Sequence, residues 1–208
     1  MKNNVIKNIT NKTLGILGGG QLGKMIAIEA SRLGIKTCIF DPNKNSPAFQ
    51  NANIIINSNY TNKKALRQFV KCSDKITYEF ENIPLESLNF LKKNSQIFPG
   101  LKALKYSQDR LLEKEFISNL GISVAPFYQI KNYADLKDAL EKFKGSAILK
   151  TRKFGYDGKG QYIIKKHRIP NIKNNIEKNK YIIEGIINFK KRNFSNSNNK
   201  KRWICNML

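Results

Sequence analysis

The chain has 208 residues, 40% of them hydrophobic, which is enough for one large domain or two small ones. No apolar run approaches the roughly 20 residues that cross a bilayer. The polar, basic residues 1–12 lack the hydrophobic core of a secretory signal, so we expect neither a membrane partner nor export. Three widely separated cysteines, Cys38, Cys72 and Cys205, show no metal-ligand spacing and fit reduced thiols in a cytoplasmic protein.

The net charge of +23 is that of a protein that attracts nucleic acid. The lysines, however, are spread along the whole chain and come with many Asn and Ile residues, which AT-rich codons favour. The sequence contains no RNP, zinc-finger or basic-zipper pattern. Composition bias therefore explains the charge better than binding does, and we expect no nucleic-acid partner.

After residues 1–12, which we expect to form a disordered leader, strands and helices alternate through residues 13–106. This alternation predicts an α/β domain whose parallel sheet carries helices on its faces. The expected strands are Thr13–Leu17, Lys36–Phe40, Asn53–Ile56, Lys75–Tyr78 and Ile97–Phe98. The expected helices are one that Gly34 ends, Lys63–Cys72 and Pro84–Lys93.

A second unit, residues 107–191, begins near Ser107. Its expected helices are Asp109–Leu120 and Tyr133–Phe143, and its expected extended segments are Val124–Ile130, Ala147–Lys150, Gln161–Ile164 and Tyr181–Ile183. Residues 192–208 show almost no apolar pattern, so we expect a disordered tail.

The first glycine-rich segment, Gly18–Gly23, fits G-x-G-x-x-G between a strand and a helix, with Asp41 about 20 positions on. Exposed N–H groups and the helix dipole favour an anion at such a turn. The pattern therefore predicts phosphate binding of some kind and leaves a nicotinamide or flavin enzyme open. The alternative is that the glycines only allow tight packing between strand and helix.

Two carboxylates, Glu79 and Glu81, follow the fourth expected strand. Ligands gather at the carboxyl ends of parallel strands, so these residues are candidates for substrate binding. Two solvated charges on a loop are an equally good interpretation.

The second glycine-rich segment, Lys150–Gln161, follows a buried-looking strand and combines three glycines with several cationic residues. A basic, glycine-rich loop can close over polyphosphate and exclude water. It lacks the Walker A pattern. A plain hairpin with a turn at Asp157-Gly158 is the alternative.

Four segments together resemble the N5-carboxyaminoimidazole ribonucleotide synthase family, the ATPase subunit of phosphoribosylaminoimidazole carboxylase. They are Thr13–Lys24 (TLGILGGGQLGK), Thr77–Pro84 (TYEFENIP), Gln108–Leu111 (QDRL) and Lys150–Gln161 (KTRKFGYDGKGQ). The resemblance runs from about Thr13 to Lys191.

The resemblance implies a Rossmann-like first domain that binds no dinucleotide, followed by the first part of an ATP-grasp α+β domain. It also implies a reaction in which ATP activates bicarbonate as carboxyphosphate, which carboxylates the exocyclic amine of 5-aminoimidazole ribonucleotide. The family's cofactors are ATP and Mg²⁺, and its magnesium ligands lie beyond the matched segments, so none is expected in this chain. Whether intact relatives form homodimers remains an open question.

The same resemblance assigns residues to two ligands. ATP would contact Arg110, Lys150, Gly155, Tyr156, Asp157, Gly158, Lys159, Gly160, Gln161, Glu184, Gly185, Ile186 and Ile187. The imidazole ribonucleotide would contact Gly20, Gln21, Leu22, Glu79 and Glu81.

The resemblance stops after Lys191, where the family continues with Glu-Ile-Ser-Val and this chain has Arg192. Back-translation of residues 192–208 with AT-rich codons, skipping one A, yields Glu-Ile-Ser-Val-Ile-Val-Ile-Thr-Arg-Lys-Asp-Gly. We therefore expect a frameshift at the run of A in codons 190–191, an aberrant tail and an inactive fragment. A divergent C-terminus is the alternative, and the nucleotide sequence distinguishes the two.

Three other functions remain open at this point. A formate-using ATP-grasp transformylase shares the architecture, although Phe154–Asp157 favours the carboxylating family. A nicotinamide-dependent oxidoreductase would leave Lys150–Gln161 unexplained. A nucleic-acid-binding module would rest on charge alone.

Overall fold

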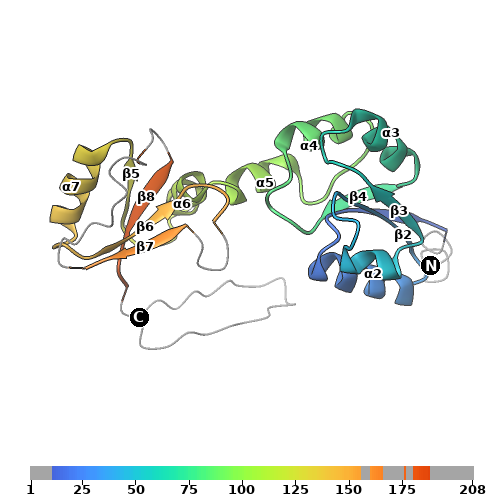
Figure 1. Ribbon diagram of the computed structural model, residues 1–208, viewed down its shortest axis with the longest axis horizontal. Helices are drawn as coiled ribbons and strands as arrows, with labels where there is room; N and C mark the ends of the chain where they lie inside the picture. The colour runs from blue at the N-terminus through green and yellow to red at the C-terminus, as the bar shows by residue number, and fades with distance from the viewer. Residues whose placement is uncertain (1–10, 156–159, 166–175, 177–179, 188–208) are drawn as a thin grey trace. The chain divides into compact units, whose positions relative to one another are not determined.

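The computed structural model describes residues 11–155, 160–165, 176 and 180–187. The chain divides after Glu113 into two compact units, which are described separately (Figure 1). Residues 1–10 of the expected leader, residues 156–159 of the second glycine segment and the expected tail, residues 192–208, lie outside the described residues, whereas Lys12 of the expected leader is described and forms an ion pair with Asp74.

The first unit is built on a four-stranded parallel sheet in the order β3-β2-β1-β4, which confirms the predicted α/β alternation. The strands are β1 (Thr13–Leu17), β2 (Lys36–Asp41), β3 (Ile54–Asn57) and β4 (Lys75–Tyr78). The helical segments are α2 (Gln21–Arg32), η1 (Pro47–Asn51), α3 (Lys63–Lys71), α4 (Leu85–Lys92) and α5 (Leu101–Ser107).

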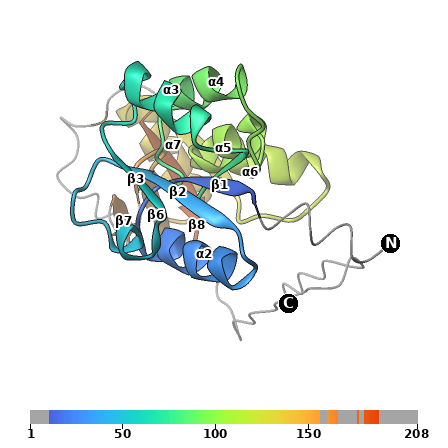
Figure 2. The same cartoon turned by 90° about the vertical axis from the view of Figure 1, so that its right-hand side faces the viewer.

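Helices cover both faces of this sheet, as Figure 2 shows, with α2 below it and α3 and α4 above. The central strands β1 and β2 are therefore buried on both sides, which explains their near-continuous apolar sequences. Ile16 and Ile39 pack on the α2 side, whereas Leu17 and Phe40 face the larger cluster on the other side. Two layers of core thus fix the carboxyl ends of the strands.

Two segments differ from the sequence prediction. Ile97 pairs with Ile76 only through an isolated parallel bridge, so the expected strand Ile97–Phe98 does not form. Pro99 has no N–H and cannot extend the pairing. Helix α5 was not predicted, because Pro99-Gly100 marks an interruption and the segment after it is too short for a clear periodicity.

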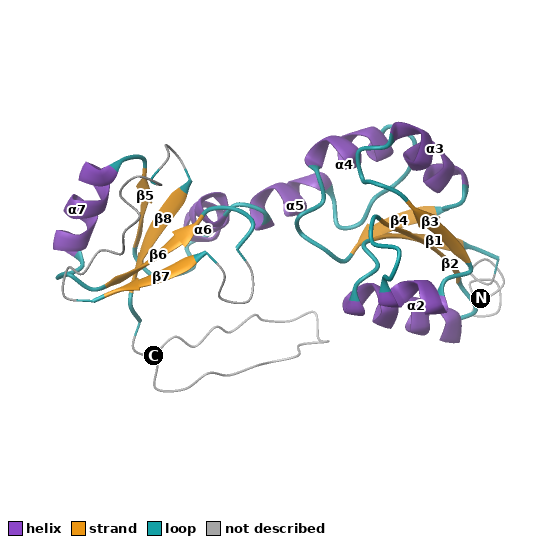
Figure 3. Ribbon diagram, in the orientation of Figure 1, coloured by secondary structure: helices purple, strands orange, loops and turns teal. Residues whose placement is uncertain are grey.

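The second unit contains an antiparallel sheet in the order β5-β8-β6-β7 (Figure 3). Its strands are β5 (Phe127–Ile130), β6 (Ala147–Thr151), β7 (Gln161–Ile164) and β8 (Tyr181–Gly185). Its helices are α6 (Arg110–Asn119), which spans the division, and α7 (Tyr133–Lys142). The mixed architecture, a parallel sheet followed by an antiparallel one, agrees with the expected fold class.

The two faces of the antiparallel sheet differ. Leu149 and Ile183 point to the α7 side and pack with Leu136 and Leu140 in the core of this unit. Strand alternation then sends Lys150 and Glu184 to the opposite face. The sheet therefore carries its charged residues on the face that α7 leaves uncovered.

Candidate functional site

The first glycine turn lies at the carboxyl end of β1 and leads into α2. Its backbone is tightly held, because the Gly18 N–H donates to the Phe40 carbonyl at 3.0 Å and the Ala48 N–H donates to the Gly19 carbonyl at 3.0 Å. The next two N–H groups donate to carboxylates. Gly19 donates to Asp41 at 2.7 Å, and Gly20 donates to Glu79 at 3.0 Å. In this structure the chain's own carboxylates occupy the donors that would otherwise hold phosphate.

Asp41 is the buried anchor of this turn. Besides the Gly19 N–H, its carboxylate accepts from the Asn43 N–H at 2.7 Å and from the Tyr60 hydroxyl at 3.2 Å. These bonds hold the glycine turn in place. They also argue against a role for Asp41 in dinucleotide binding, because a carboxylate that accepts from three donors inside the protein is not available to a ribose. The structure therefore weighs against a nicotinamide site.

The glycines of the turn are required by close packing. Gly18 has φ +99°, and a Cβ on Gly20 would come within 2.9 Å of the Glu79 carboxylate. A Cβ on Gly23 would come within 2.6 Å of the Gly18 carbonyl oxygen, which is backbone and cannot move aside. The tight-packing interpretation of G-x-G-x-x-G thus has direct support.

The two candidate carboxylates after β4 do not share an environment. Glu79 is half-buried against the turn, and Glu81 is exposed. Burial raises the pKa of Glu79, the Gly20 N–H lowers it, and the negative charges of Asp41 and Glu81 raise it again. Gln21 and Leu22 are exposed at the start of α2, with Leu22 58% accessible. The structure thus places the predicted ribonucleotide residues at the carboxyl ends of β1 and β4, where Gly20 and Glu79 are half-buried.

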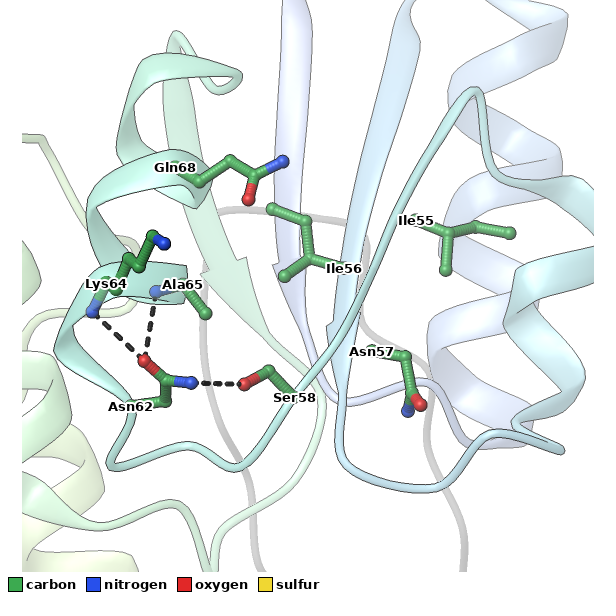
Figure 4. Close-up of a pocket in the computed structure, with 8 residues that line it drawn as sticks. All are labelled: Ile55, Ile56, Asn57, Ser58, Asn62, Lys64, Ala65 and Gln68. Atoms are coloured by element: carbon green, nitrogen blue, oxygen red, sulfur yellow. Dashed lines mark hydrogen bonds between the residues drawn. The ribbon is translucent and has the colours of Figure 1, made fainter.

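A separate cavity of about 320 Å³ lies beside the edge strand β3 and the start of α3 (Figure 4). The Asn62 side chain at its rim accepts from the N–H groups of Lys64 and Ala65, so it already caps the helix. Asn62 also donates to the Ser58 hydroxyl at 3.0 Å. Asn62 and Ser58 are thus engaged with each other and with the start of α3, and no predicted site residue lines the cavity.

The face of the second sheet opposite α7 carries an ion cluster. The Lys150 ammonium lies 2.9 Å from the Glu184 carboxylate, and the Lys114 ammonium lies 3.3 Å from the same oxygen. All three side chains are largely buried, with 19%, 16% and 8% exposed for Lys150, Lys114 and Glu184. Two cations against one anion give the cluster a net positive charge, which suits the phosphates of a nucleotide.

Lys114 was not predicted from the sequence. It lies on α6 and also sits 5.7 Å from the centre of the Phe127 ring on β5. Its partner Glu184 is 70 positions away in the chain, so only the fold brings them together. The only feature of the sequence that could have indicated Lys114 is its position three residues after the QDRL segment, Gln108–Leu111.

The second glycine segment connects β6 to β7 as a hairpin. The Thr151 N–H donates to the Gly160 carbonyl at 2.8 Å and closes its base, and Lys150 pairs with Gln161 across the ladder. Phe154 next to Gly155 is 73% exposed and has φ 60°, an uncommon conformation for a side chain of its size. The predicted residues Tyr156, Asp157, Gly158 and Lys159 lie outside the described residues.

The remaining predicted nucleotide residues lie at two other places. Gly185 ends β8 and Ile186 and Ile187 follow it; all three line a cavity of about 390 Å³ together with Pro126, Phe143 and Ser146. Ile186 and Ile187 expose 40% and 41% of their side chains, which offers an apolar surface to a flat ring. Arg110 begins α6 and is half-buried.

Comparisons with known proteins match both units. Residues 11–108 match the ribonucleotide synthetase preATP-grasp domain, and residues 115–193 match the ATP-grasp domain. The N5-carboxyaminoimidazole ribonucleotide synthase of Bacillus subtilis is 43% identical over 152 residues, which cover 73% of this chain and 40% of that protein. The chain belongs to the N5-carboxyaminoimidazole ribonucleotide synthase family.

Other similar proteins and solved structures support the same family assignment. A bifunctional purine synthesis protein, purC/E, of Dictyostelium discoideum is 49% identical over 149 residues, 72% of this chain and 15% of that protein. The Staphylococcus aureus N5-carboxyaminoimidazole synthetase complexed with ADP superposes with a TM-score of 0.78 at 38% identity. The superposition covers 86% of this chain and 48% of that one. The Aspergillus clavatus synthase in complex with ADP and 5-aminoimidazole ribonucleotide gives a TM-score of 0.76 at 26% identity, covering 87% and 48%.

The chain thus spans less than half the length of these synthase relatives. The part that it spans matches the preATP-grasp domain over residues 11–108 and the ATP-grasp domain over residues 115–193.

Proposed function

We propose that this chain supplies two parts of an ATP-dependent ligase. The antiparallel sheet would face the nucleotide, and the carboxyl ends of the parallel strands β1 and β4 would face the ribonucleotide. The reaction is the carboxylation of 5-aminoimidazole ribonucleotide with bicarbonate to N5-carboxyaminoimidazole ribonucleotide, in purine biosynthesis in the cytoplasm. The observation that carries the proposal is the Lys150–Glu184–Lys114 cluster on the face opposite α7 of a sheet that matches the ATP-grasp domain. Family membership at 43% identity supplies the chemistry.

The cluster accounts for phosphate binding by charge. Glu184 holds both lysine side chains in fixed positions, so their ammonium groups need little reorganisation when phosphate arrives. The Thr151–Gly160 closure anchors the glycine-rich hairpin directly after Lys150, at the place from which it would cover the phosphates. Water would be excluded from carboxyphosphate in this way.

In the first unit, the half-buried Glu79 at the carboxyl end of β4 would face the ribonucleotide. Because the turn donors are already taken by Asp41 and Glu79, the turn offers the substrate a carboxylate surface in place of an anion hole. A carboxylate accepts hydrogen bonds from hydroxyl or amino groups and repels phosphate. We therefore propose that the hydroxyl or amino groups of the ribonucleotide approach Glu79, and that its phosphate lies elsewhere.

Mg²⁺ would accompany ATP and neutralise its phosphates. Among the described residues no group of three His, Cys, Asp or Glu side chains could hold a metal ion. We therefore assign no metal-binding step to the described residues. None of the helices in that same part of the chain is long and apolar enough to span a bilayer.

A chimera tests the proposal. Residues 1–187 of this chain are joined to the remaining C-terminal part of the Bacillus subtilis synthase, and ADP release is measured. We expect ADP release to require both 5-aminoimidazole ribonucleotide and bicarbonate. Release that responds to formate in place of bicarbonate would favour the transformylase alternative, and release independent of the ribonucleotide would contradict the proposal.

A further inference from the structure

Two thiols meet on the α3 side of the parallel sheet, away from both predicted ligand sites. Cys38 lies in the middle of β2 and is fully buried. Cys72 forms the C-cap of α3 and is partly exposed. Cys38 belongs to the larger hydrophobic cluster of the first unit, and Cys72 packs against that cluster.

Gly15 explains why they are close. Gly15 lies in β1 and pairs with Cys38 in the adjacent strand β2. A Cβ on Gly15 would come within 2.8 Å of both the Ser73 Cβ and the Phe69 ring. The missing side chain lets the end of α3 rest directly on the sheet. Cys72, which precedes Ser73, is thereby brought next to Cys38.

The immediate surroundings of Cys38 confirm the contact. The pKa of the Cys38 thiol is raised to about 12, mainly by burial and in smaller part by the charge and hydrogen bonding of the neighbouring Cys72 thiol. The Ser73 hydroxyl acts on the same thiol in the opposite direction. That hydroxyl is buried and has no nitrogen or oxygen partner in the described part of the chain. Cys38 is therefore a protonated thiol whose accessible neighbour is Cys72.

We propose that Cys38 and Cys72 form a modification site that closes into an intramolecular disulfide by exchange with a low-molecular-weight disulfide. The order of steps follows from burial, since only Cys72 reaches solvent. The Cys72 thiolate attacks glutathione disulfide, forms a mixed disulfide and releases one glutathione thiolate. Cys38 then loses its proton and attacks the Cys72 sulfur, releasing the second glutathione. Two protein thiols are oxidised and one glutathione disulfide is reduced to two thiols.

The bond would tie β2 to the end of α3. Because β2 ends at Asp41, the anchor of the glycine turn, the cross-link lies in the element that positions this turn.

Peptide mapping tests the proposal on the full chain. The protein is incubated with glutathione disulfide near pH 8, where thiolate is available, alkylated and digested with trypsin without reduction. Trypsin separates the three cysteines into residues 37–44, 72–75 and 203–208. We expect 37–44 joined to 72–75 to dominate over every pair that contains 203–208. A mixed disulfide at Cys72 without the link, or equal amounts of all pairs, overturns the proposal.

Two variants sharpen the test. In Cys72→Ser we expect Cys38 to stay reduced, with glutathione incorporation at least about tenfold lower than at Cys205, because the buried thiol has lost its only route to the oxidant. Cys205→Ser is the matched control and should form the 38–72 link as the wild type does. If Cys38 reacts equally fast in both variants, the proposal fails. If Cys72→Ser does not fold, the wild-type and Cys205→Ser maps decide.

Discussion

At the scale of single residues, the ion cluster of the second unit holds two lysine side chains in place against one glutamate and carries a net positive charge. Glu184 contacts both Lys150 and Lys114 within 3.3 Å and is almost fully buried. Burying three charges is costly unless each is paired, and this arrangement pairs them while remaining attractive to an anion. The cluster is therefore better explained as a prepared binding surface than as a source of stability.

Replacing Lys150 by methionine tests that role. The side chain keeps its length and loses one charge-assisted contact to phosphate, worth about 1.5–3 kcal/mol. In the chimera we expect Lys150→Met to raise the KM for ATP by about 10- to 100-fold. Lys131→Met, at an exposed position of the same unit, is the control and should leave the KM unchanged. An unchanged KM in Lys150→Met would remove Lys150 from the nucleotide site.

Glu79 gives a pH-dependent prediction. Its pKa is raised in the fold, mainly by burial, so ionisation weakens the folded state as the pH rises through that pKa. Glu79→Gln keeps an acceptor for the Gly20 N–H and never ionises. We expect its stability relative to the wild type, measured by urea unfolding, to increase from about pH 4 to about pH 7. Glu81→Gln, at the exposed neighbour, serves as the charge control. A difference for Glu79→Gln that stays constant with pH would contradict this account.

At the scale of elements, the glycine turn fixes how α2 meets β1. A Cβ on Gly23 would meet the Gly18 carbonyl at 2.6 Å, whereas a Cβ on Gly100 would meet nothing within 4 Å. We expect Gly23→Ala to destabilise the protein by about 2 kcal/mol through overpacking. Gly100→Ala should cost less, about 0.5–1 kcal/mol, since Gly100 has an ordinary φ of −69° and the change replaces only a favourable N-cap residue. Equal urea midpoints for the two variants would refute the packing explanation.

The sequence predicted the strands of both sheets well where the pattern was local. The strands Thr13–Leu17, Lys75–Tyr78 and Gln161–Ile164 have the predicted bounds, because apolar runs ended by turn residues define them. The sequence could not show which N–H groups of the glycine turn were already satisfied. That depends on Asp41 and Glu79, which reach the turn from other strands. Lys114 was missed for the same reason, since its role is defined by a partner on β8.

At the scale of the whole molecule, the chain covers 40% of the Bacillus subtilis relative and matches a preATP-grasp domain and an ATP-grasp domain. A phosphoryl-transfer site needs metal ligands and a second wall around the nucleotide. We expect purified residues 1–208 to release no ADP in response to 5-aminoimidazole ribonucleotide. A coupled assay for ADP checks this, with the chimera as the positive control, and turnover by the chain alone would show that these residues suffice.

The most direct test of the central claim follows a labelled carbon. The chimera is supplied with ATP, 5-aminoimidazole ribonucleotide and ¹³C-bicarbonate, and the product is examined by NMR. The account predicts that the label appears as a carbamate on the exocyclic nitrogen of the imidazole, in step with ADP. It also predicts that Lys150→Met lowers both signals together. ADP formation while the label remains in bicarbonate would contradict it.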